Sequence, residues 1–345
     1  MDTKNSIKDY KKLKKNNWLN LSKDEQIDLF NHLSVITGFP AIAIEKDAWV
    51  TLALRMLFGS ELKDKIVFKG GTSLSKCYNL INRLSEDIDF SIEREFLGFS
   101  GDLTKGEIRK LRRASHNFIL SELPELLSNE LEHYGIDGKC FSVEVPNTKI
   151  SDQDPETVLL KYKSVFAKET YLLPRVQIEI GARSLMEPFE EKEINSIIDS
   201  NMTEANFTED RFKVNTVIPT KTFIEKLILL HEEFKKPSEK TKYLRMSRHL
   251  YDIVQIMETS YFDEAKKDKI LFRDICKHRE KFTPLKPVGT IDYNELTFER
   301  LEIIPPKGII GNYRADYTEM QSTMFYGESL SFDEVIAKMG AITKR

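Results

Sequence analysis

The chain has 345 residues, which at roughly 150 residues per domain is enough for about two domains with a buried core. Hydrophobic residues make up 40% and charged residues 31%, a composition typical of a folded globular protein. Lys and Arg number 52 against 55 Asp and Glu, so the net charge of −3 excludes a positive field over the whole molecule that recruits nucleic acid or membrane. Any site for a polyanion must therefore be local.

No apolar stretch approaches the roughly 20 residues that span a bilayer, and the Lys-rich start is not followed by the apolar segment of a signal peptide. We therefore expect a cytoplasmic protein with no membrane partner. The three cysteines, Cys77, Cys140 and Cys276, lie far apart without metal-binding spacing, so we expect them to be reduced and structural.

The first predicted elements are two helices. A capping box from Ser22 to Glu25 predicts a helix that ends at Gly38, and a second helix is expected over 40–58. A strand over 66–68 follows.

A glycine turn comes directly after this short apolar strand. Gly70 and Gly71 are followed by a segment with helical periodicity over 73–80, which predicts strand, turn and helix. Such a turn lets backbone N–H groups approach phosphate oxygens at the positive end of a helix. No Gly-Lys-Ser/Thr follows the glycines, so the turn is not a Walker loop.

The segment 87–92 alternates strictly between polar and apolar residues. Ile88 and Phe90 face one way and Asp87 and Asp89 the other, which predicts a half-buried strand with an acidic face. Carboxylates two apart on one strand face stand about 6–7 Å apart at Cα and can hold a divalent cation together. We expect Mg²⁺ as the cofactor of an in-line phosphoryl displacement.

Further along, the pattern predicts a basic helix over 105–134, with a break near Pro124. Three strands are expected after it, at 140–145, 157–165 and 175–180. The last strand places Val176 and Ile178 on its core face and Glu179 on its polar face. From this alternation Glu179 is our candidate for a third metal carboxylate beside Asp87 and Asp89. The basic run 105–113 is either a solvated helix face or a contact for RNA phosphates.

After about residue 215 the periodicity becomes helical, with helices expected at 220–234, 240–257, 262–280 and 332–339. We therefore expect a catalytic domain over 1–215 and a helical C-terminal domain over 216–345. The fold class is α/β or α+β, with a mixed sheet.

Each half of the candidate site also has a plain structural interpretation, because a glycine pair is often a simple turn and Asp-x-Asp a solvated strand face. In the order turn, helix, acidic strand, the combination favours a site for nucleotide and metal. The order resembles the nucleotidyltransferase superfamily related to DNA polymerase β.

A narrower resemblance is to the AbiEii/AbiGii nucleotidyltransferase toxin family. It rests on segments from about residue 44 to 340, namely Ile44-Glu-Lys-Asp47 with Trp49-Val-Thr51, Lys69-Gly-Gly-Thr-Ser-Leu74, Arg83-x-Ser-x-Asp-Ile-Asp-Phe90, Thr222-Phe-x-Glu-Lys226, Arg248-His-Leu-Tyr-Asp252, Asp316-Tyr-x-x-Met320 and Phe325-Tyr-Gly327.

The resemblance implies the toxin of a toxin–antitoxin or phage-defence (abortive infection) pair that uses an NTP and Mg²⁺, with RNA, for example the 3′ end of a tRNA, as acceptor. It matches Gly71, Thr72 and Ser73 to the family turn, Asp87 and Asp89 to the metal carboxylates, and Lys226 and Asp252 to later catalytic motifs. The implied partner is an antitoxin, expected to be a winged-helix protein. The sequence leaves open whether GTP, CTP or UTP is the substrate.

The helical half offers further candidates. On one helix, Arg245, Arg248, His249 and Asp252 would form a single stripe suited to a triphosphate, or else a solvated face. Lys226 would face the incoming nucleotide or pair with a surface glutamate. The expected nucleotide-binding set is Gly70, Gly71, Thr72, Ser73, Lys76, Arg248 and His249.

Other assignments from this half stay open. His231 and His249 are possible general bases, but metal activation of the acceptor reduces the need for one. Tyr243 either stacks on a base or packs in the core. Two functional alternatives also stay open: nucleotidyl or phosphoryl transfer to a protein or small molecule, and a non-catalytic nucleotide-binding module.

Overall fold

The computed structural model describes residues 17–84, 87–146, 154–166, 172–282 and 291–343, so most of the Lys-rich start lies outside the described residues. The chain forms two compact units. Unit 1 comprises Met1–Phe68, Glu86–Ala182 and Glu191–Thr216, and unit 2 comprises Lys69–Ser85, Arg183–Glu190 and Val217–Arg345. This division differs from the expected one at residue 215 because two segments of the first half pack with the C-terminal helices.

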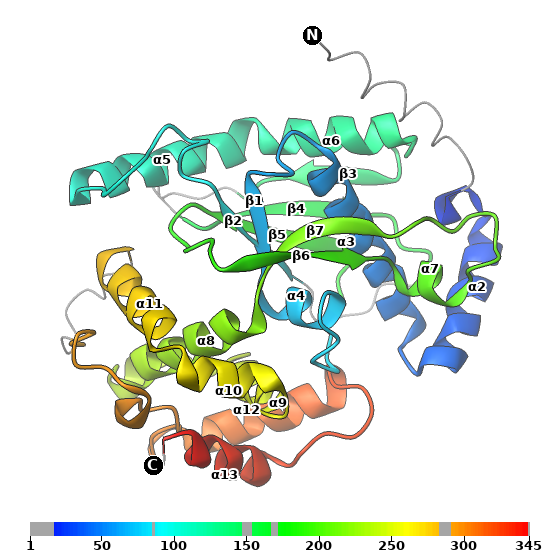
Figure 1. Ribbon diagram of the computed structural model, residues 1–345. Helices are drawn as coiled ribbons and strands as arrows, with labels where there is room; N and C mark the ends of the chain where they lie inside the picture. Colours follow the sequence, from blue (N-terminus) through cyan, green and yellow to red (C-terminus); the bar gives the residue numbers. More distant parts are fainter. Residues whose placement is uncertain (1–16, 85–86, 147–153, 167–171, 283–290, 344–345) are drawn as a thin grey trace. The chain divides into compact units, whose positions relative to one another are not determined.

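The described residues form a seven-stranded mixed sheet, most of which belongs to unit 1 (Figure 1). Strands β2 and β5 are parallel, as are β1 and β7, whereas β3, β4 and β5 pair antiparallel. The order across the sheet is β3 (Phe141–Glu144), β4 (Glu156–Tyr162), β5 (Arg175–Gly181), β2 (Asp87–Ile92), β1 (Ile66–Lys69), β7 (Phe212–Val217) and β6 (Phe189–Ile194).

The expected α/β class with a mixed sheet is therefore confirmed. Strand β6 was not predicted because its sequence, Phe189-Glu-Glu-Lys-Glu-Ile194, lacks an apolar face, as an exposed edge strand can. Strand β7 was also not predicted, and it ends where the helical pattern begins.

The helices of unit 1 are α2 (Lys23–Thr37), α3 (Ala41–Gly59), α5 (Lys105–Ser121), α6 (Leu123–Tyr134) and the short α7 (Ile197–Asn201), after the 3-10 turn η1 (Trp18–Asn20). The predicted long basic helix is divided at Glu122 into α5 and α6, so the expected break is confirmed. Pro124 is tolerated because it lies in the first turn of α6, where the backbone nitrogen has no intrahelical acceptor.

The apolar face of β2 supplies the centre of this core. The ring of Phe90 lies 5.9 Å from that of Phe58 and 5.7 Å from that of Phe68, and all three side chains are buried. Ile88 is fully buried beside them. The alternation predicted for this strand is thus confirmed, and it directs the aspartates to the opposite face.

Two acidic side chains of α3 accept hydrogen bonds from neighbouring segments of the chain. Glu45 accepts hydrogen bonds from Ser164 Oγ at 2.6 Å and from the backbone N–H of Val165 at 2.8 Å. Asp47 accepts one from the N–H of Ile197 at 2.8 Å. The buried Glu45 and the half-buried Asp47 therefore bind backbone and hydroxyl groups of unit 1, which satisfies their carboxylates.

Unit 2 consists of helices around one apolar core that includes Leu74, Phe223, Tyr251 and Tyr313. Its helices are α4 (Gly70–Lys76), α8 (Pro219–Phe234), α9 (Ser247–Met257), α10 (Ser260–Lys267), α11 (Lys269–Phe282), α12 (Ile310–Thr323) and α13 (Phe332–Ile342), with short turns η2 (Ser238–Lys240) and η3 (Phe298–Arg300).

Two of the helices expected in unit 2 had wrong bounds, and one helix was missed. The helix predicted over 240–257 begins only at Ser247, because Arg245 has a φ of 60° and cannot lie in a right-handed helix. The helix predicted over 262–280 is two helices that meet at Asp268. Helix α12 was not predicted at all.

Among the described residues, no single helix is long and apolar enough to cross a membrane, and α2 and α3 reach that length only as a pair bent by 104°.

Candidate functional site

Unit 1 contains the acidic half of the candidate site, on two neighbouring parallel strands. Asp89 of β2 lies in register with Glu179 of β5, and Asp87 lies in register with Gln177. Residues in register on parallel strands point to the same face, so the three predicted carboxylates share the polar face of the sheet. Sequence alternation alone identified Glu179, and the strand pairing brings it beside Asp89.

The geometry of this acidic face suits a cation only in part. Asp87, Asp89 and Glu179 are half-buried, and carboxylate oxygens are the ligands that Mg²⁺ prefers. One oxygen of Glu179 accepts a hydrogen bond from Gln177 Nε2 at 2.9 Å. In the part of the chain that the structure describes, no three acidic, His or Cys side chains gather closely enough to hold a metal ion. The chemistry of the carboxylates fits Mg²⁺, but their spacing does not form a closed cage, so the three-carboxylate site stays a prediction.

The glycine turn belongs to unit 2, where β1 passes directly into helix α4. The order of strand, glycines and helix is as predicted, but the helix begins at Gly70 and ends at Lys76 instead of covering 73–80. Gly70 has a φ of 83°, a conformation that favours glycine. Thr72 and Ser73 are buried, and the Ser73 hydroxyl donates to the carbonyl of Gly70 at 2.9 Å. The hydroxyl proton of Ser73 thus closes the turn, while Leu74 anchors the helix in the apolar core.

Four side chains of unit 2 form a buried charged cluster. Asp252 on α9 accepts two hydrogen bonds from Arg83, at 2.7 Å from Nε and at 2.8 Å from Nη2. Lys226 on α8 lies 2.9 Å from the same carboxylate, and its Nζ lies 3.3 Å from Nδ1 of His249. The structure thus brings together three residues that the sequence analysis had singled out, Lys226, His249 and Asp252.

The charges in this cluster shift the pKa values of its members. Burial tends to raise the pKa of the Asp252 carboxyl, but Arg83 and Lys226 outweigh it and hold the pKa far below its usual range. Burial lowers the pKa of Lys226, against the attraction of Asp252. Burial and the charges of Lys226 and Arg248 lower the pKa of His249 well below 6.5, so its ring is neutral at pH 7. The neutral ring can accept a hydrogen bond from Lys226.

These contacts correct the predicted stripe on α9. Arg245 lies outside the helix, and Asp252 is fully buried, so the four residues do not form one exposed face. His249 is neutral, so it does not offer a positive charge to a phosphate. Arg248 is half-buried next to it.

The other histidine considered as a general base has a structural partner. Nδ1 of His231 accepts the backbone N–H of Glu302 at 2.9 Å, and burial lowers the pKa of the ring.

Arg83 is the residue that sequence reasoning missed. Its guanidinium also donates to the carbonyl of Leu84 at 3.0 Å, and its backbone pairs with Phe325 in an isolated antiparallel bridge. The N–H of Tyr326 donates to the carbonyl of Asn82 at 3.0 Å. The available signal was the Arg83-x-Ser segment itself, together with Phe325-Tyr-Gly327, which the fold places against it.

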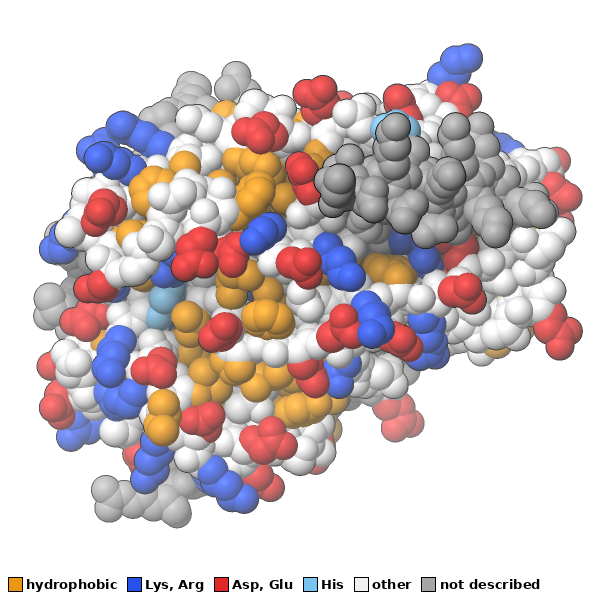
Figure 2. All heavy atoms as spheres, turned by 45° about the horizontal axis from the view of Figure 1, so that its top comes forward, with side chains coloured by type: hydrophobic (Ala, Val, Ile, Leu, Met, Phe, Trp, Pro, Cys, Tyr) orange, Lys and Arg blue, Asp and Glu red, His pale blue; other side chains and the backbone are white. Residues whose placement is uncertain are grey.

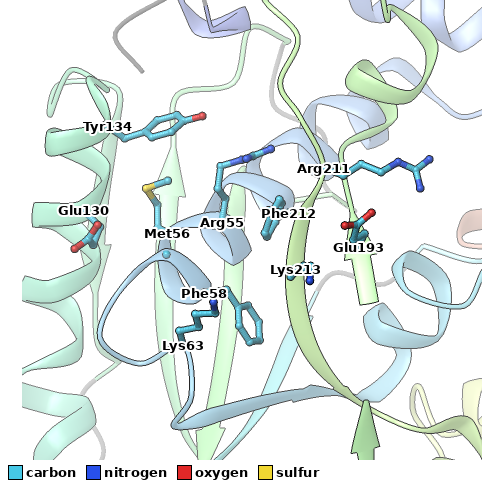
Figure 3. Close-up of a pocket in the computed structure, with 11 residues that line it drawn as sticks. Arg55, Met56, Phe58, Lys63, Glu130, Tyr134, Glu193, Arg211, Phe212 and Lys213 are labelled. Atoms are coloured by element: carbon cyan, nitrogen blue, oxygen red, sulfur yellow. The ribbon is translucent and has the colours of Figure 1, made fainter. Parts of the chain in front are cut away.

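Unit 1 also contains a pocket of about 500 Å³ that includes none of the predicted site residues (Figure 3). Arg55 lies over the ring of Phe212 at 4.4 Å and pairs with Glu209 at 2.9 Å. The lining mixes cations, carboxylates and aromatic rings: Arg55, Met56, Phe58, Gly59, Lys63, Glu130, Tyr134, Glu193, Arg211, Phe212 and Lys213. We assign it no part in the transfer reaction.

Basic side chains follow the outer face of α5. Lys105, Arg109, Lys110 and Arg113 are exposed, as either interpretation of the run 105–113 requires. On the face drawn in Figure 2, basic and acidic side chains are mixed and no large area has a single sign. This distribution agrees with the overall charge of −3.

Comparison with protein families identifies the class to which this arrangement belongs. A family model described as "Nucleotidyl transferase AbiEii toxin, Type IV TA system" matches residues 53–338. Because the match spans most of the chain, this protein belongs to the AbiEii family of nucleotidyltransferase toxins of type IV toxin–antitoxin systems. It is an enzyme with an antitoxin partner, which sets aside the non-catalytic alternative.

Among solved structures, this chain is similar to two bacterial proteins. MenT4, a nucleotidyltransferase toxin from Mycobacterium tuberculosis, is 15% identical, and the match covers 94% of this chain and 100% of that chain with a TM-score of 0.44. JHP933 from Helicobacter pylori is 14% identical, and the match covers 87% of this chain and 90% of that chain with a TM-score of 0.41. No curated protein gives a significant sequence match.

Proposed function

We propose that this toxin transfers a nucleoside monophosphate from an NTP to the 3′ hydroxyl of an RNA, with tRNA as the expected acceptor and Mg²⁺ as the expected cofactor. The acceptor oxygen forms a bond to the α-phosphorus, the bond to the β-phosphate breaks, and pyrophosphate leaves as the hydroxyl gives up its proton. The observation that carries this proposal is the register of Asp89 with Glu179, two carboxylates facing the same side of adjacent strands.

Asp87, Asp89 and Glu179 are the residues that would hold the cation. When bound, a divalent cation neutralises charge on the triphosphate and favours ionisation of the attacking hydroxyl. The half-buried positions of the three carboxylates support this role, since they leave each side chain partly accessible.

The residues of the glycine turn, Gly70, Gly71, Thr72 and Ser73, would hold phosphate oxygens through their backbone N–H groups, and Lys76 and Arg248 would add positive charge. The φ of Gly70 supports this role because it lets the backbone turn where a side chain would be strained.

Lys226 and Asp252 have different roles in this proposal. Lys226 would add positive charge to the nucleotide site from its position 2.9 Å from the Asp252 carboxylate. Asp252 is fully buried and binds both Arg83 and Lys226, which supports a positioning role instead of contact with substrate. The cognate antitoxin is expected to be a winged-helix protein, and a neighbouring gene that encodes such a protein would support this assignment.

The test is incubation of the protein with total cellular RNA, Mg²⁺ and each of the four α-³²P-labelled NTPs, followed by a denaturing gel. We expect label on a tRNA-sized band with wild type and none with Asp89→Asn. The matched control is Glu191→Gln, an exposed carboxylate on strand β6 of the same sheet, which should label RNA like wild type.

Other results would redirect the proposal. Label on a protein or a small molecule would move the acceptor to that class, and terminal-phosphate transfer would identify a kinase. Full RNA labelling by a folded Asp89→Asn would refute the metal role.

A further inference from the structure

The segment before helix α9 exposes large apolar side chains in an unusual way. Tyr243 is 45% exposed and Leu244 is 76% exposed, although both lie in the middle of unit 2's chain between two core helices. Of the two interpretations of Tyr243 that the sequence left open, packing in the core is therefore wrong. Adjacent exposed aromatic and aliphatic side chains indicate an interaction site, because burying them in the core would stabilise the fold.

Hydrogen bonds to a carboxylate of α12 fix the backbone of this segment. The carboxylate of Asp316 on α12 accepts hydrogen bonds from the N–H of Arg245 at 2.6 Å and of Ser247 at 3.0 Å. These bonds hold Arg245 at its left-handed φ of 60°, which costs free energy for a residue other than glycine.

Two further contacts fix the start of the segment. The hydroxyl of Tyr313 donates to the carbonyl of Lys242 at 2.8 Å, and Glu233 accepts the N–H of Lys242 at 2.6 Å. Hydrogen bonds with side chains of α8 and α12 thus fix the backbone conformation in which Tyr243 and Leu244 are exposed.

The charges around the two apolar side chains are mainly positive. Residues 239–248 contain four basic side chains and one acidic side chain, in a protein whose net charge is −3. Lys240, Lys242 and Arg245 are exposed, and Arg248 is half-buried at the start of α9. An aromatic ring among cations is the pattern of single-stranded nucleic-acid sites, where bases stack and phosphates pair with Lys and Arg.

This segment directly precedes, in the sequence, a residue of the charged cluster of unit 2. Arg248 and His249 follow it directly on α9, and His249 contacts Lys226. An exposed segment with cations spread over several residues suits a chain of nucleotides, whereas a single triphosphate calls for a concave site.

We propose that the exposed segment 240–248 binds the single-stranded end of the acceptor RNA, with a base stacked on Tyr243 and against Leu244 and with phosphates on Lys240, Lys242 and Arg245. This inference rests on the proposed function, since it names where that function's RNA acceptor lies. Tyr243 is a substrate-binding residue in this proposal, and Asp316 positions the segment that carries it.

The first experiment measures binding of a 5′-fluorescein-labelled single-stranded RNA 12-mer to the full chain by fluorescence anisotropy, without NTP. We expect Tyr243→Ala to weaken binding by about tenfold and Tyr243→Phe to bind like wild type, because loss of one stacked base costs on the order of 1–3 kcal/mol. The control is Ile270→Ala on α11, an aliphatic side chain that is 77% exposed in the same unit.

The second experiment is the labelling assay with the same variants. We expect Tyr243→Ala to raise KM for RNA while kcat and KM for the NTP stay unchanged. We also expect Lys242→Ala to weaken the dependence of RNA binding on salt concentration, with a change in slope of about one for each phosphate that the variant no longer neutralises.

The outcomes separate this inference from the proposed function. If wild type labels RNA and Tyr243→Ala has an unchanged KM for RNA, the segment is not the RNA site although the transfer reaction stands. A change in KM for the NTP alone would place the base of the incoming nucleotide on Tyr243 and overturn the inference. A loss of antitoxin inhibition with RNA binding intact would make the segment a protein-docking surface, and wild type that neither binds nor labels RNA would refute both proposals.

Discussion

Arg83 and Asp252 form a buried, two-bond ion pair between the segment after α4 and helix α9, with nitrogen–oxygen distances of 2.7 and 2.8 Å. Lys226 binds the same carboxylate at 2.9 Å, so two buried cations depend on one buried anion. Removing one partner of such a pair costs more than the pair contributes, because it leaves a charge without compensation in a medium of low dielectric constant.

Asp252→Asn is therefore expected to destabilise the protein by about 3–5 kcal/mol. The measurement is urea unfolding at pH 7.5, followed by circular dichroism. The control is Asp333→Asn, which removes an exposed carboxylate paired with Arg314 and should change the midpoint little. Equal midpoints for Asp252→Asn and wild type would mean that the carboxylate is not structural, and any loss of activity would then be chemical.

A second prediction concerns pH. The pKa of His249 is lowered well below 6.5 in the folded state, so below about pH 6.5 the unfolded chain binds a proton that the folded chain does not. Stability is therefore lost as the pH falls from 6.5 towards the lowered folded pKa, by up to about 1.4 kcal/mol per pH unit. The loss is absent above pH 6.5, where both states are neutral.

His249→Gln removes this titration while keeping a group that can accept from Lys226 Nζ. Between pH 7.5 and pH 5.5 the urea midpoint of wild type should therefore fall by more than the midpoint of the variant. His231, whose pKa is also lowered by burial, is present in both proteins and cancels in the comparison. A difference that does not vary with pH would show that His249 is protonated to the same extent in both states.

The glycine turn yields a third prediction. Gly70→Ala places a side chain at a φ of 83°, which costs roughly 1–2 kcal/mol and moves the N–H groups that follow. We expect a lower melting temperature and a higher KM for the NTP. Gly340→Ala on α13 is the control, because open space surrounds that position and alanine favours a helix by up to about 1 kcal/mol. An unchanged KM in a destabilised Gly70→Ala would limit the turn to a structural role.

The sequence could predict β2 in full because one buried face imposes a strict two-residue period from Asp87 to Ile92. The same period identified Glu179 on β5 as a partner for the acidic pair, although only the parallel register shows that it faces Asp89. The edge strand β6 could not be predicted, since its exposed position imposes no apolar period.

The charged cluster of unit 2 lay beyond sequence reasoning for a different reason. Arg83 and Asp252 are 169 positions apart, and nothing local in either segment encodes their contact. The start of α9 was misplaced because Asp316, on another helix, holds Arg245 in a left-handed conformation. Tertiary contacts of this kind override helical periodicity.

The last prediction separates the metal role of Glu179 from its role in the sheet. Glu179→Gln keeps an oxygen that can accept from Gln177 Nε2 but removes the negative charge, so the strand pairing should survive. We expect an unchanged melting temperature and an increase of at least about tenfold in the Mg²⁺ concentration needed for half-maximal RNA labelling. The titration is done at a fixed, saturating NTP concentration, with Glu191→Gln on β6 as the matched carboxylate control. If both variants need the same Mg²⁺ as wild type, Glu179 is no metal ligand, and the cation would depend on Asp87 and Asp89 alone.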